Sequence, residues 1–276
     1  MSVANAITAG IIYALTELLG LSGSGHLAVM NSLFDLRMTE MNLIFKAFTE
    51  FAVFLALILA WRKEIAEMIR DTAGLTGFGG GPVKKGTRYP GARLLFMQAV
   101  ATLPLLLMLP FRRAYFTLWG HTSFVGAMLL LNGLILAVCE RMQPGKKGIG
   151  AMKITDALLI GICQAVAVIP GISRLAVTVT ASQAEGIRKT EAIRFGMLLA
   201  IPAMFGSSVL SLADAASTGI ESAYLPAYLW GGVAALMTGF FTVFGFKTLV
   251  RRRGYGGLAY YSWVIGVLAI ILTLIF

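Results

Sequence analysis

Residues 10–30, "GIIYALTELLGLSGSGHLAVM", decide how this chain can fold. Apolar residues surround the stretch, yet its middle contains Glu17, Ser22, Ser24 and His26 together with three glycines. A lipid-exposed helix cannot interrupt its backbone hydrogen bonds at membrane depth, because no water is present there to replace them. An ionisable side chain at that depth costs about 2.5–3.5 kcal/mol on insertion scales. The stretch therefore predicts two helices with a polar tip between them, and not one continuous span.

The composition of the whole chain is typical of an integral membrane protein. Hydrophobic residues make up 58% of the 276 residues, charged residues only 13%, and the mean hydropathy is +0.81. Soluble domains contain roughly 25% charged residues. A helix needs roughly 20 apolar residues to cross a bilayer, and six segments meet that length. These segments are approximately 43–61, 92–110, 117–139, 191–213, 223–246 and 259–276.

A second interrupted apolar stretch, at 154–183, is similar to the first, at 4–30. When "GIIYALTELLGLS" (10–22) is aligned with "GICQAVAVIPGIS" (161–173), small or polar residues coincide at one offset of 151 residues. The coinciding pairs are Gly10 and Gly161, Ala14 and Ala165, Gly20 and Gly171, and Ser22 and Ser173. The alternative is a chance similarity between two apolar segments.

We therefore predict an all-α polytopic membrane protein with about six transmembrane helices and two re-entrant helix hairpins. The chain is expected to form a single membrane domain, 1–276, made of inverted repeats at approximately 1–150 and 151–276. One hairpin enters the bilayer from each side, so that the broken helices meet near the midplane and form a site there.

The basic segments predict the orientation of the chain. Cytoplasmic loops contain an excess of Lys and Arg, which places 62–93, 140–153 and 247–253 on the cytoplasmic side. The loop 214–222 contains acidic residues and no Lys or Arg, so it is expected to face outward. Arg112 and Arg113 fit poorly, because they fall on the outer side.

Two other classes of protein are excluded by the sequence. The net charge of +10 does not indicate nucleic-acid binding, because most Lys and Arg flank apolar runs, where they orient the chain and contact anionic lipid. The two cysteines, Cys139 and Cys163, lie inside apolar runs, which favours neither a disulfide framework nor a metal–thiolate site.

If the two hairpin tips meet, polar residues from both halves form one site. These residues are Glu17, Ser22, Ser24, His26, Ser173, Arg174 and Thr178. Arg174 is predicted to bind phosphate, because a planar guanidinium holds two oxygens at once and the glycine-rich tips expose backbone N–H groups. The alternative for Arg174 is a structural ion pair with Glu17 or Glu50.

The other polar residues allow more than one role. His26 is a general acid or base, a nucleophile, or a core histidine whose nitrogens are satisfied. Glu17 either holds a divalent cation, Mg²⁺ or Ca²⁺, together with substrate oxygens, or pairs with Arg174. Glu50 either supports the site or marks the end of a span, and His121 is expected at the membrane interface.

At these residues the sequence resembles the undecaprenyl pyrophosphate phosphatase family, and the resemblance covers nearly the whole chain. The stretch "TELLGLSGSGHL" is similar to the family's Glu-x-x-x-x-Ser-x-x-Gly-His signature, and "PGISRLAVT" is similar to its Pro-Gly-x-Ser-Arg-Ser-Gly-x-Thr tip. The matching residues are Glu17, Ser22, Gly25, His26, Pro170, Gly171, Ser173, Arg174 and Thr178.

The resemblance implies hydrolysis of a polyprenyl diphosphate, at an outward-facing site of the bacterial inner (plasma) membrane, during recycling of the envelope lipid carrier. It implies a divalent cation at Glu17, catalytic roles for Glu17, His26 and Arg174, and Ser22 or Ser24 as a substitute nucleophile. The implied substrate-binding residues are Gly25, Gly171, Ser173, Arg174 and Thr178. The expected partners are the polyprenyl lipid, the surrounding membrane lipids and a second copy of the chain in a homodimer.

Several positions depart from the family pattern. Tyr13 stands where the family has the first residue of its acidic pair, Gly23 replaces a serine proposed as nucleophile, and Lys46 stands where an acidic residue is common. Ser24 replaces threonine, Gly20 replaces proline, and Leu175 and Ala176 replace Ser-Gly. The alternative function is therefore a diverged, non-hydrolytic relative that binds or translocates a polyprenyl phosphate lipid.

Overall fold

The structure, a computed structural model, describes residues 2–34, 41–77, 89–143, 145–218 and 224–275. Helices connected by short loops make up these residues, and the described ranges contain no β-strand. The α-helices are α1 (Val3–Leu18), α2 (Gly23–Phe34), α3 (Met41–Ala60), α4 (Arg62–Thr76), α5 (Pro90–Leu106), α6 (Arg112–Thr117), α7 (Thr122–Arg141), α8 (Ile154–Val166), α9 (Arg174–Ala184), α10 (Lys189–Thr218), α11 (Leu225–Arg253) and α12 (Gly256–Ile275). Three 3₁₀ turns are η1 (Leu109–Phe111), η2 (Leu118–Gly120) and η3 (Ile149–Ala151).

Six of these helical segments are long and apolar enough to cross a membrane, which confirms the predicted number of spans. The segments are Leu43–Ala60, Pro90–Phe111, Thr122–Arg141, Lys189–Ala216, Leu225–Phe246 and Gly256–Ile275. The third span begins at Thr122 and not at 117, because the residues before it form the short elements α6 and η2. The basic segment after the first span contains a helix, α4, which the sequence analysis did not predict.

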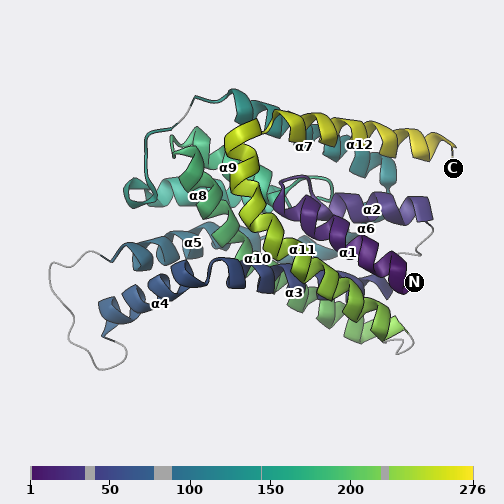
Figure 1. The fold of residues 1–276 in the computed structure, drawn as a ribbon, viewed down its shortest axis with the longest axis horizontal. Coiled ribbons are helices and arrows are strands. Elements are labelled where there is room, and N and C mark those ends of the chain that lie inside the picture. The colour runs from purple at the N-terminus through teal and green to yellow at the C-terminus, as the bar shows by residue number, and fades with distance from the viewer. Residues whose placement is uncertain (1, 35–40, 78–88, 144, 219–223, 276) are drawn as a thin grey trace.

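Both interrupted stretches are broken where the sequence predicted. The break between α1 and α2 has positive φ angles at Gly20 (81°) and at Ser22 (69°), and the break between α8 and α9 has one at Gly171 (99°). A positive φ ends a right-handed helix and is unusual for a residue with a side chain. In Figure 1 the pair α1–α2 returns to the end of the molecule that holds both termini, and α8–α9 lies toward the opposite end. The re-entrant path of each pair through a bilayer stays a prediction.

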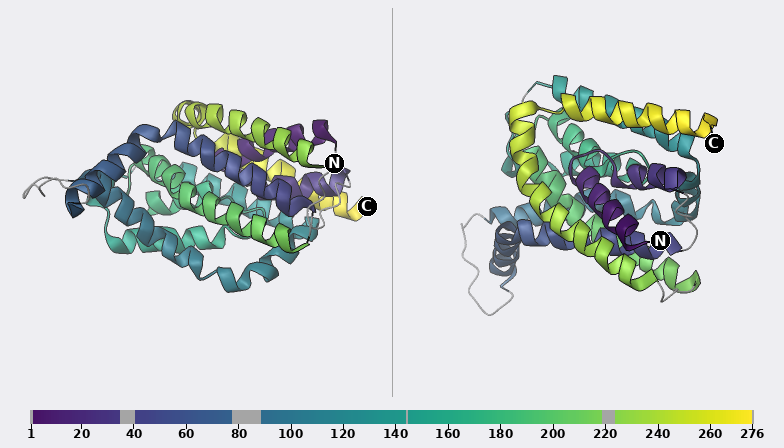
Figure 2. Two further views of the ribbon diagram at one scale, coloured as in Figure 1. Left: turned by 90° about the horizontal axis from the view of Figure 1, so that it is seen from below. Right: turned by 45° about the vertical axis from the view of Figure 1, so that its right-hand side comes forward.

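The first helix of each broken pair packs closely against a long helix. Helix α1 lies along α11, and α8 lies along α5 (Figures 1 and 2). A Cβ atom on Gly10 would collide with the carbonyl oxygen of Gly231, and one on Gly161 would collide with that of Ala101. Gly10 and Gly161 are equivalent in the predicted repeat, so equivalent glycines allow the backbones to approach in both halves. The remaining long helices pack as α3 against α10 and α11, and α7 against α12.

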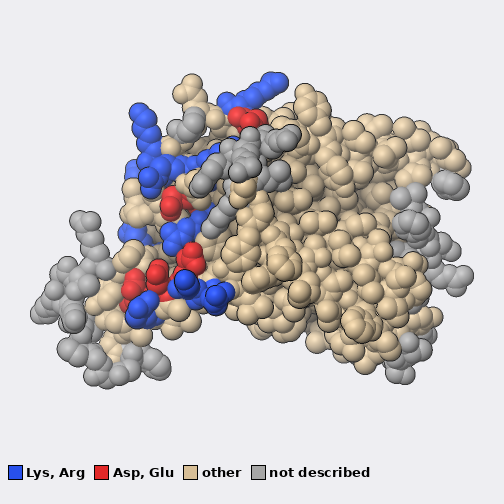
Figure 3. All heavy atoms as spheres, viewed as in Figure 1, with Lys and Arg blue, Asp and Glu red and all other residues tan. Residues whose placement is uncertain are grey.

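Charged side chains gather at one end of the molecule. Figure 3 shows the described Lys and Arg over the end near α4 and α8, whereas the described surface over α1 and the first part of α11 is almost free of charge. The described basic side chains of 62–93 and 140–153 therefore gather at one end, whereas the side chains of Lys247, Arg251, Arg252 and Arg253 are not described. Lys84, Lys85, Arg88 and Glu221, which entered the orientation argument, lie outside the described residues.

Candidate functional site

The two hairpin tips touch through the side chain of Ser22. Its Oγ atom accepts hydrogen bonds from the backbone N–H of Gly25 and from that of Gly171, each at 3.2 Å. Gly25 also stands directly against Gly171, since a Cβ atom on Gly25 would lie 2.8 Å from the Gly171 Cα. The structure thus brings together the two tips, which are almost 150 residues apart in the chain.

A second link between the tips comes from α7. The Asn132 side chain is fully buried, donates to the carbonyl oxygen of Gly20 at 3.0 Å and accepts from the N–H of Ser173 at 2.9 Å. One amide therefore satisfies a backbone group in each tip. The sequence analysis missed Asn132, although an amide inside an apolar span indicates an interhelical hydrogen bond.

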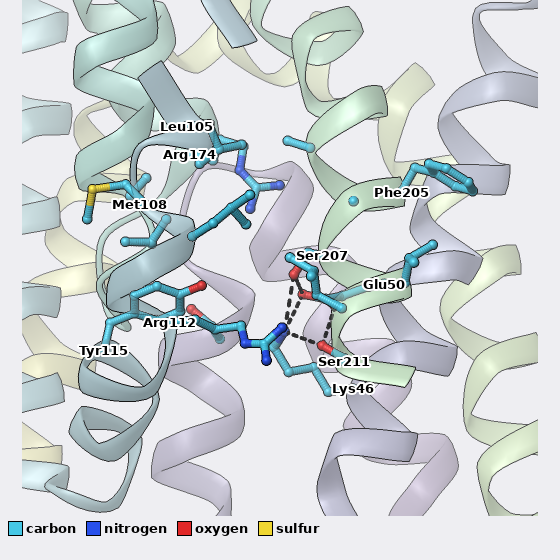
Figure 4. A pocket seen from close by; sticks show the side chains of 18 of the residues that line it. Lys46, Glu50, Leu105, Met108, Arg112, Tyr115, Arg174, Phe205, Ser207 and Ser211 are labelled. Atoms are coloured by element: carbon cyan, nitrogen blue, oxygen red, sulfur yellow. Dashed lines mark hydrogen bonds and ion pairs between the residues drawn. The ribbon is translucent and has the colours of Figure 1, made fainter. Parts of the chain in front are cut away.

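A cavity of about 380 Å³ lies beside the tips (Figure 4). Its polar lining consists of Tyr13, Glu17, Ser24, Lys46, Glu50, Thr102, Arg112, Tyr115, Arg174, Ser207, Ser211 and Asp214. Apolar side chains of α5 and α10, such as Leu105 and Phe205, form much of the remaining wall. Three predicted site residues, Glu17, Ser24 and Arg174, therefore line the same space.

Arg174 is held at the beginning of α9. Ser173 caps this helix, because its hydroxyl oxygen accepts from the N–H of Ala176 at 3.4 Å. The N-terminus of a helix favours negative charge, since its first N–H groups have no intrahelical partner. The Nε and Nη1 atoms of Arg174 are buried without a hydrogen-bond partner, and Figure 4 shows the guanidinium pointing into the cavity.

The structural ion pair considered for Arg174 does not form. Within the described part of the chain, no salt bridge joins it to Glu17 or to Glu50. Since an unpaired guanidinium nitrogen is costly to bury, the geometry favours an anionic ligand at Arg174.

Glu17 is fixed by the start of α2. Its Oε2 atom accepts from the N–H of Gly23 at 3.0 Å, which occupies one carboxylate oxygen. The nearby carboxylate of Glu50 is bound by Lys46 at 2.8 Å. Among the residues that the structure describes, no three His, Cys, Asp or Glu side chains converge to hold a metal ion. These residues do not form a dedicated divalent-cation site, and Glu17 could act only as a single ligand beside substrate oxygens.

The three predicted nucleophiles occupy different places. Ser24 lines the cavity, and its Oγ atom lies 3.3 Å from that of Ser22. Ser22 is fully buried and accepts from two backbone N–H groups. His26 is buried, its Nδ1 atom lies 2.9 Å from the Ser22 carbonyl oxygen, and its ring stacks on Tyr261 of α12 with 5.6 Å between centroids. His26 is not among the residues lining this cavity, so it supports the tip from behind, with its Nε2 atom buried and unbonded.

Thr178 is likewise set back from the cavity. Its hydroxyl donates to the carbonyl oxygens of Arg174 at 2.9 Å and of Leu175 at 3.2 Å, both on its own helix. It is fully buried and supports the first turn of α9. The structure thus places Thr178 behind Arg174 and not beside it.

A cluster of polar side chains that line the cavity joins α3 to α10. The Lys46 Nζ atom lies 2.8 Å from Glu50 Oε1, 2.8 Å from Ser211 Oγ and 3.2 Å from Ser207 Oγ. The sequence analysis noted Lys46 and Glu50 but missed Ser207 and Ser211. Two serines four residues apart on an apolar helix share one face, which is the signal that could have identified them.

A second ion pair of the cavity involves Arg112, one of the two arginines that did not fit the predicted orientation. Arg112 Nη2 lies 2.8 Å from Asp214 Oδ1, and both residues line the cavity. Of the two arginines that did not fit the predicted orientation, Arg112 therefore has an acidic partner, and the side chain of Arg113 is not described.

Two departures from the family pattern contact each other. A Cβ atom on Gly23 would lie 2.9 Å from two ring carbons of Tyr13 and 2.9 Å from its backbone carbonyl oxygen, so the ring and the backbone of residue 13 together fill the space that a side chain at position 23 would need. The Tyr13 hydroxyl is 3.9 Å from the sulfur of Met204. Tyr13 and Gly23 therefore form one packing unit at the cavity.

Comparison with known proteins agrees with this geometry. The sequence pattern of the family described as "Bacitracin resistance protein BacA" matches residues 6–268. An undecaprenyl-diphosphatase of Halothermothrix orenii is 29% identical over 277 residues, and one of Alkaliphilus metalliredigens is 31% identical over 282 residues, each covering 100% of both chains. One of Methanobrevibacter smithii is 30% identical over 274 residues, 97% of this chain and 96% of the relative. With a match over nearly its whole length, this chain belongs to the BacA family.

Proposed function

We propose that this protein hydrolyses undecaprenyl diphosphate to undecaprenyl phosphate and phosphate, in recycling of the envelope lipid carrier. The relatives named undecaprenyl-diphosphatase align with it from end to end. The observation that carries the proposal is Arg174, whose buried, unbonded guanidinium nitrogens point into a cavity lined by both polar and apolar side chains. A lipid with a diphosphate head group and a hydrocarbon tail matches such a mixed lining.

Binding and charge stabilisation are the roles of the two tips. In phosphoryl transfer, most of the catalytic demand is to position the groups and to stabilise charge on the transferred phosphoryl group. Arg174 holds the diphosphate through two N–H donors, and the starts of α2 and α9 add their positive helix ends. Among the three predicted nucleophiles we assign the attack to Ser24, because Ser24 lines the cavity, whereas Ser22 and His26 support the tip. Its oxygen bonds to the terminal phosphorus as the bridging P–O bond breaks, undecaprenyl phosphate leaves with the hydroxyl proton, and water then hydrolyses the phosphoserine to release phosphate.

Gly25, Gly171, Ser173 and Thr178 do not line the cavity, so we propose that they support substrate binding indirectly, by holding the two tips together and by fixing the start of α9. Each packs or hydrogen-bonds so that the two helix starts face one cavity. For Mg²⁺ or Ca²⁺ we derive no catalytic step. A divalent cation would be held by Glu17 and substrate oxygens alone and would bind weakly.

We further propose that this protein lies in the bacterial inner membrane, that its two halves are inverted repeats, and that its site opens to the outer side. The gathering of Lys and Arg at one end supports the orientation, and the equivalent contacts of Gly10 and Gly161 support the repeat. The homodimer stays a prediction.

The test is phosphate release from undecaprenyl diphosphate by the purified protein in detergent. We expect one phosphate and one undecaprenyl phosphate per substrate, and loss of turnover in Arg174→Ala. Ser24→Ala should lose turnover but still bind the lipid, whereas Ser22→Ala should also lower stability. Bound lipid without phosphate release by the unmodified protein, under every cation condition, would favour the binding or translocating alternative instead.

A further inference from the structure

The cavity holds a lysine whose ammonium group is surrounded by oxygen atoms. Three acceptors, from Glu50, Ser207 and Ser211, lie within 3.2 Å of the Lys46 Nζ atom, and the Trp119 ring centroid lies 5.7 Å away. Ser207 also donates to Glu50 Oε1 at 2.7 Å, so the oxygens are fixed relative to one another. The Lys46 side chain is 16% exposed, and Figure 4 shows it beside the cavity that Arg174 enters from another wall.

This set of oxygens is of the kind that binds a hard metal cation. Mg²⁺ and Ca²⁺ prefer carboxylate and hydroxyl-type oxygen ligands. In this chain the ammonium group of Lys46 lies among these oxygens, where a metal ion would otherwise bind. The positive charge at this position therefore belongs to a side chain of the protein.

The other acidic residues of the cavity are also engaged. Glu17 accepts from the Gly23 N–H, and Asp214 pairs with Arg112. Tyr13, one helical turn before Glu17, contributes no carboxylate. The cavity therefore offers an incoming diphosphate fixed cations, and no free cluster of carboxylates to recruit a metal.

We propose that Lys46 is a substrate-binding residue whose ammonium group takes the place of a divalent cation as the counter-charge of the diphosphate. On binding, Lys46 exchanges a serine hydroxyl for a phosphate oxygen while Glu50 keeps it in position. Hydrolysis then proceeds without a divalent cation. This inference rests on the proposed phosphatase function. It adds Lys46 as a substrate-binding residue and states that hydrolysis does not need a divalent cation.

The first experiment measures phosphate release with EDTA and with added Mg²⁺ or Ca²⁺. The unmodified protein should retain most of its turnover in EDTA. Lys46→Met should lose about 10-fold or more of the metal-free turnover, as expected for loss of a hydrogen bond from a charged donor. Added Mg²⁺ or Ca²⁺ should restore part of it, because the oxygens of Glu50, Ser207 and Ser211 become free to bind a cation. Lys63→Met, on an exposed position of α4, is the matched control and should change nothing.

The second experiment measures metal-free binding of inorganic pyrophosphate to Glu50→Gln. Removing the carboxylate frees the Lys46 charge, so the affinity should rise by about 10-fold. A purely structural Lys46–Glu50 pair predicts lower stability with unchanged or weaker affinity. This variant decides the question even if Lys46→Met fails to fold.

Three outcomes would overturn the inference: loss of turnover in EDTA by the unmodified protein, full metal-free turnover by Lys46→Met, or no gain in pyrophosphate affinity by Glu50→Gln. Each of them leaves the phosphatase function in place. Absence of turnover by the unmodified protein under every cation condition would instead overturn the phosphatase function.

Discussion

The two hairpin tips begin from similar sequences and end with different chemistry. The first tip supplies acceptors and a hydroxyl, with Glu17, Ser22 and Ser24 around the start of α2. The second supplies a cation, Arg174, at the start of α9. The starts of α2 and α9 lie together at the contact of the two tips, and their unequal side chains make that place asymmetric. An asymmetric site can hold a diphosphate in one orientation, which cleavage at one phosphate requires.

The largest effect is expected from Arg174→Lys, which removes the distinctive chemistry of the second tip. A lysine keeps the charge but cannot form the bidentate fork. Loss of one charge-assisted hydrogen bond, about 1.5–3 kcal/mol, corresponds to about 10- to 100-fold in phosphate release and in pyrophosphate affinity. Equal activity with Lys would show that Arg174 is not a phosphate clamp.

The connection between the tips can be broken with Asn132→Leu. This change leaves the Gly20 carbonyl and the Ser173 N–H buried without their partner, at about 1–3 kcal/mol for each group. Thermal unfolding in detergent should show the loss of stability, and turnover should fall because the tips are no longer held together. Leu134→Ala, at a half-exposed position of the same helix, is the control. Equal unfolding of the two variants would contradict the bridging role.

The packing of Tyr13 on Gly23 can be tested in a double-mutant cycle. Gly23→Ser should destabilise the first tip by about 1–3 kcal/mol, because its Cβ atom would overlap the Tyr13 ring. Tyr13→Glu removes the ring but keeps the backbone carbonyl oxygen, so the double variant should recover part of the stability that the sum of the single effects would lose. Additive effects would show that the two positions are independent.

Tyr13→Glu also restores a second carboxylate one turn before Glu17. Residues four apart share a helix face, so this carboxylate would point at the same volume. We expect higher divalent-cation affinity, measured by titration calorimetry, and a phosphatase activity that rises with added cation. A folded variant with neither gain would show that a second carboxylate beside Glu17 does not create a cation site.

The smallest effect concerns how each hairpin begins. The hydroxyl of Ser2 caps α1, whereas the carboxylate of Asp156 accepts from the Lys153 N–H at 2.8 Å and pairs with Lys147 at the start of α8. Burial alone would raise the pKa of Asp156, but the hydrogen bonds from Lys147 and from the Lys153 N–H outweigh it and hold the pKa below its ordinary value. A depressed pKa in the folded state stabilises the protein at neutral pH, and this contribution is lost as the pH falls below about 4.

Asp156→Asn should therefore lower stability by about 1 kcal/mol at neutral pH, and the difference from the unmodified protein should shrink in acid. Thermal unfolding in detergent at neutral pH and at a pH below about 4 measures the loss of stability and its dependence on pH. Ser2→Ala removes a helix-capping hydrogen bond without a titrating group, the one that the Asn5 N–H donates to Ser2, so its effect should not change with pH. A pH-independent effect of Asp156→Asn would show that its charge does not matter.

The sequence by itself determined the spans, the two breaks and three of the residues that line the cavity. These features are local, because apolar length sets a span and because a polar or glycine-rich interruption cannot remain in a lipid-exposed helix. Glu17, Ser24 and Arg174 were identifiable because each is a polar residue within or beside such an interruption.

Only the tertiary structure decided which polar groups face the cavity and which support it. Packing against neighbouring helices determines how a helix is rotated about its own axis, and so which side chains face the cavity. In α2, His26 stacks on Tyr261, whereas Ser24, two residues earlier, lines the cavity. Lys46 finds Ser207 and Ser211 only because α3 packs on α10, and Asn132 reaches both tips only because α7 lies beside them. The sequence contains these residues, but contacts between segments 41 to 165 residues apart depend on how whole helices pack.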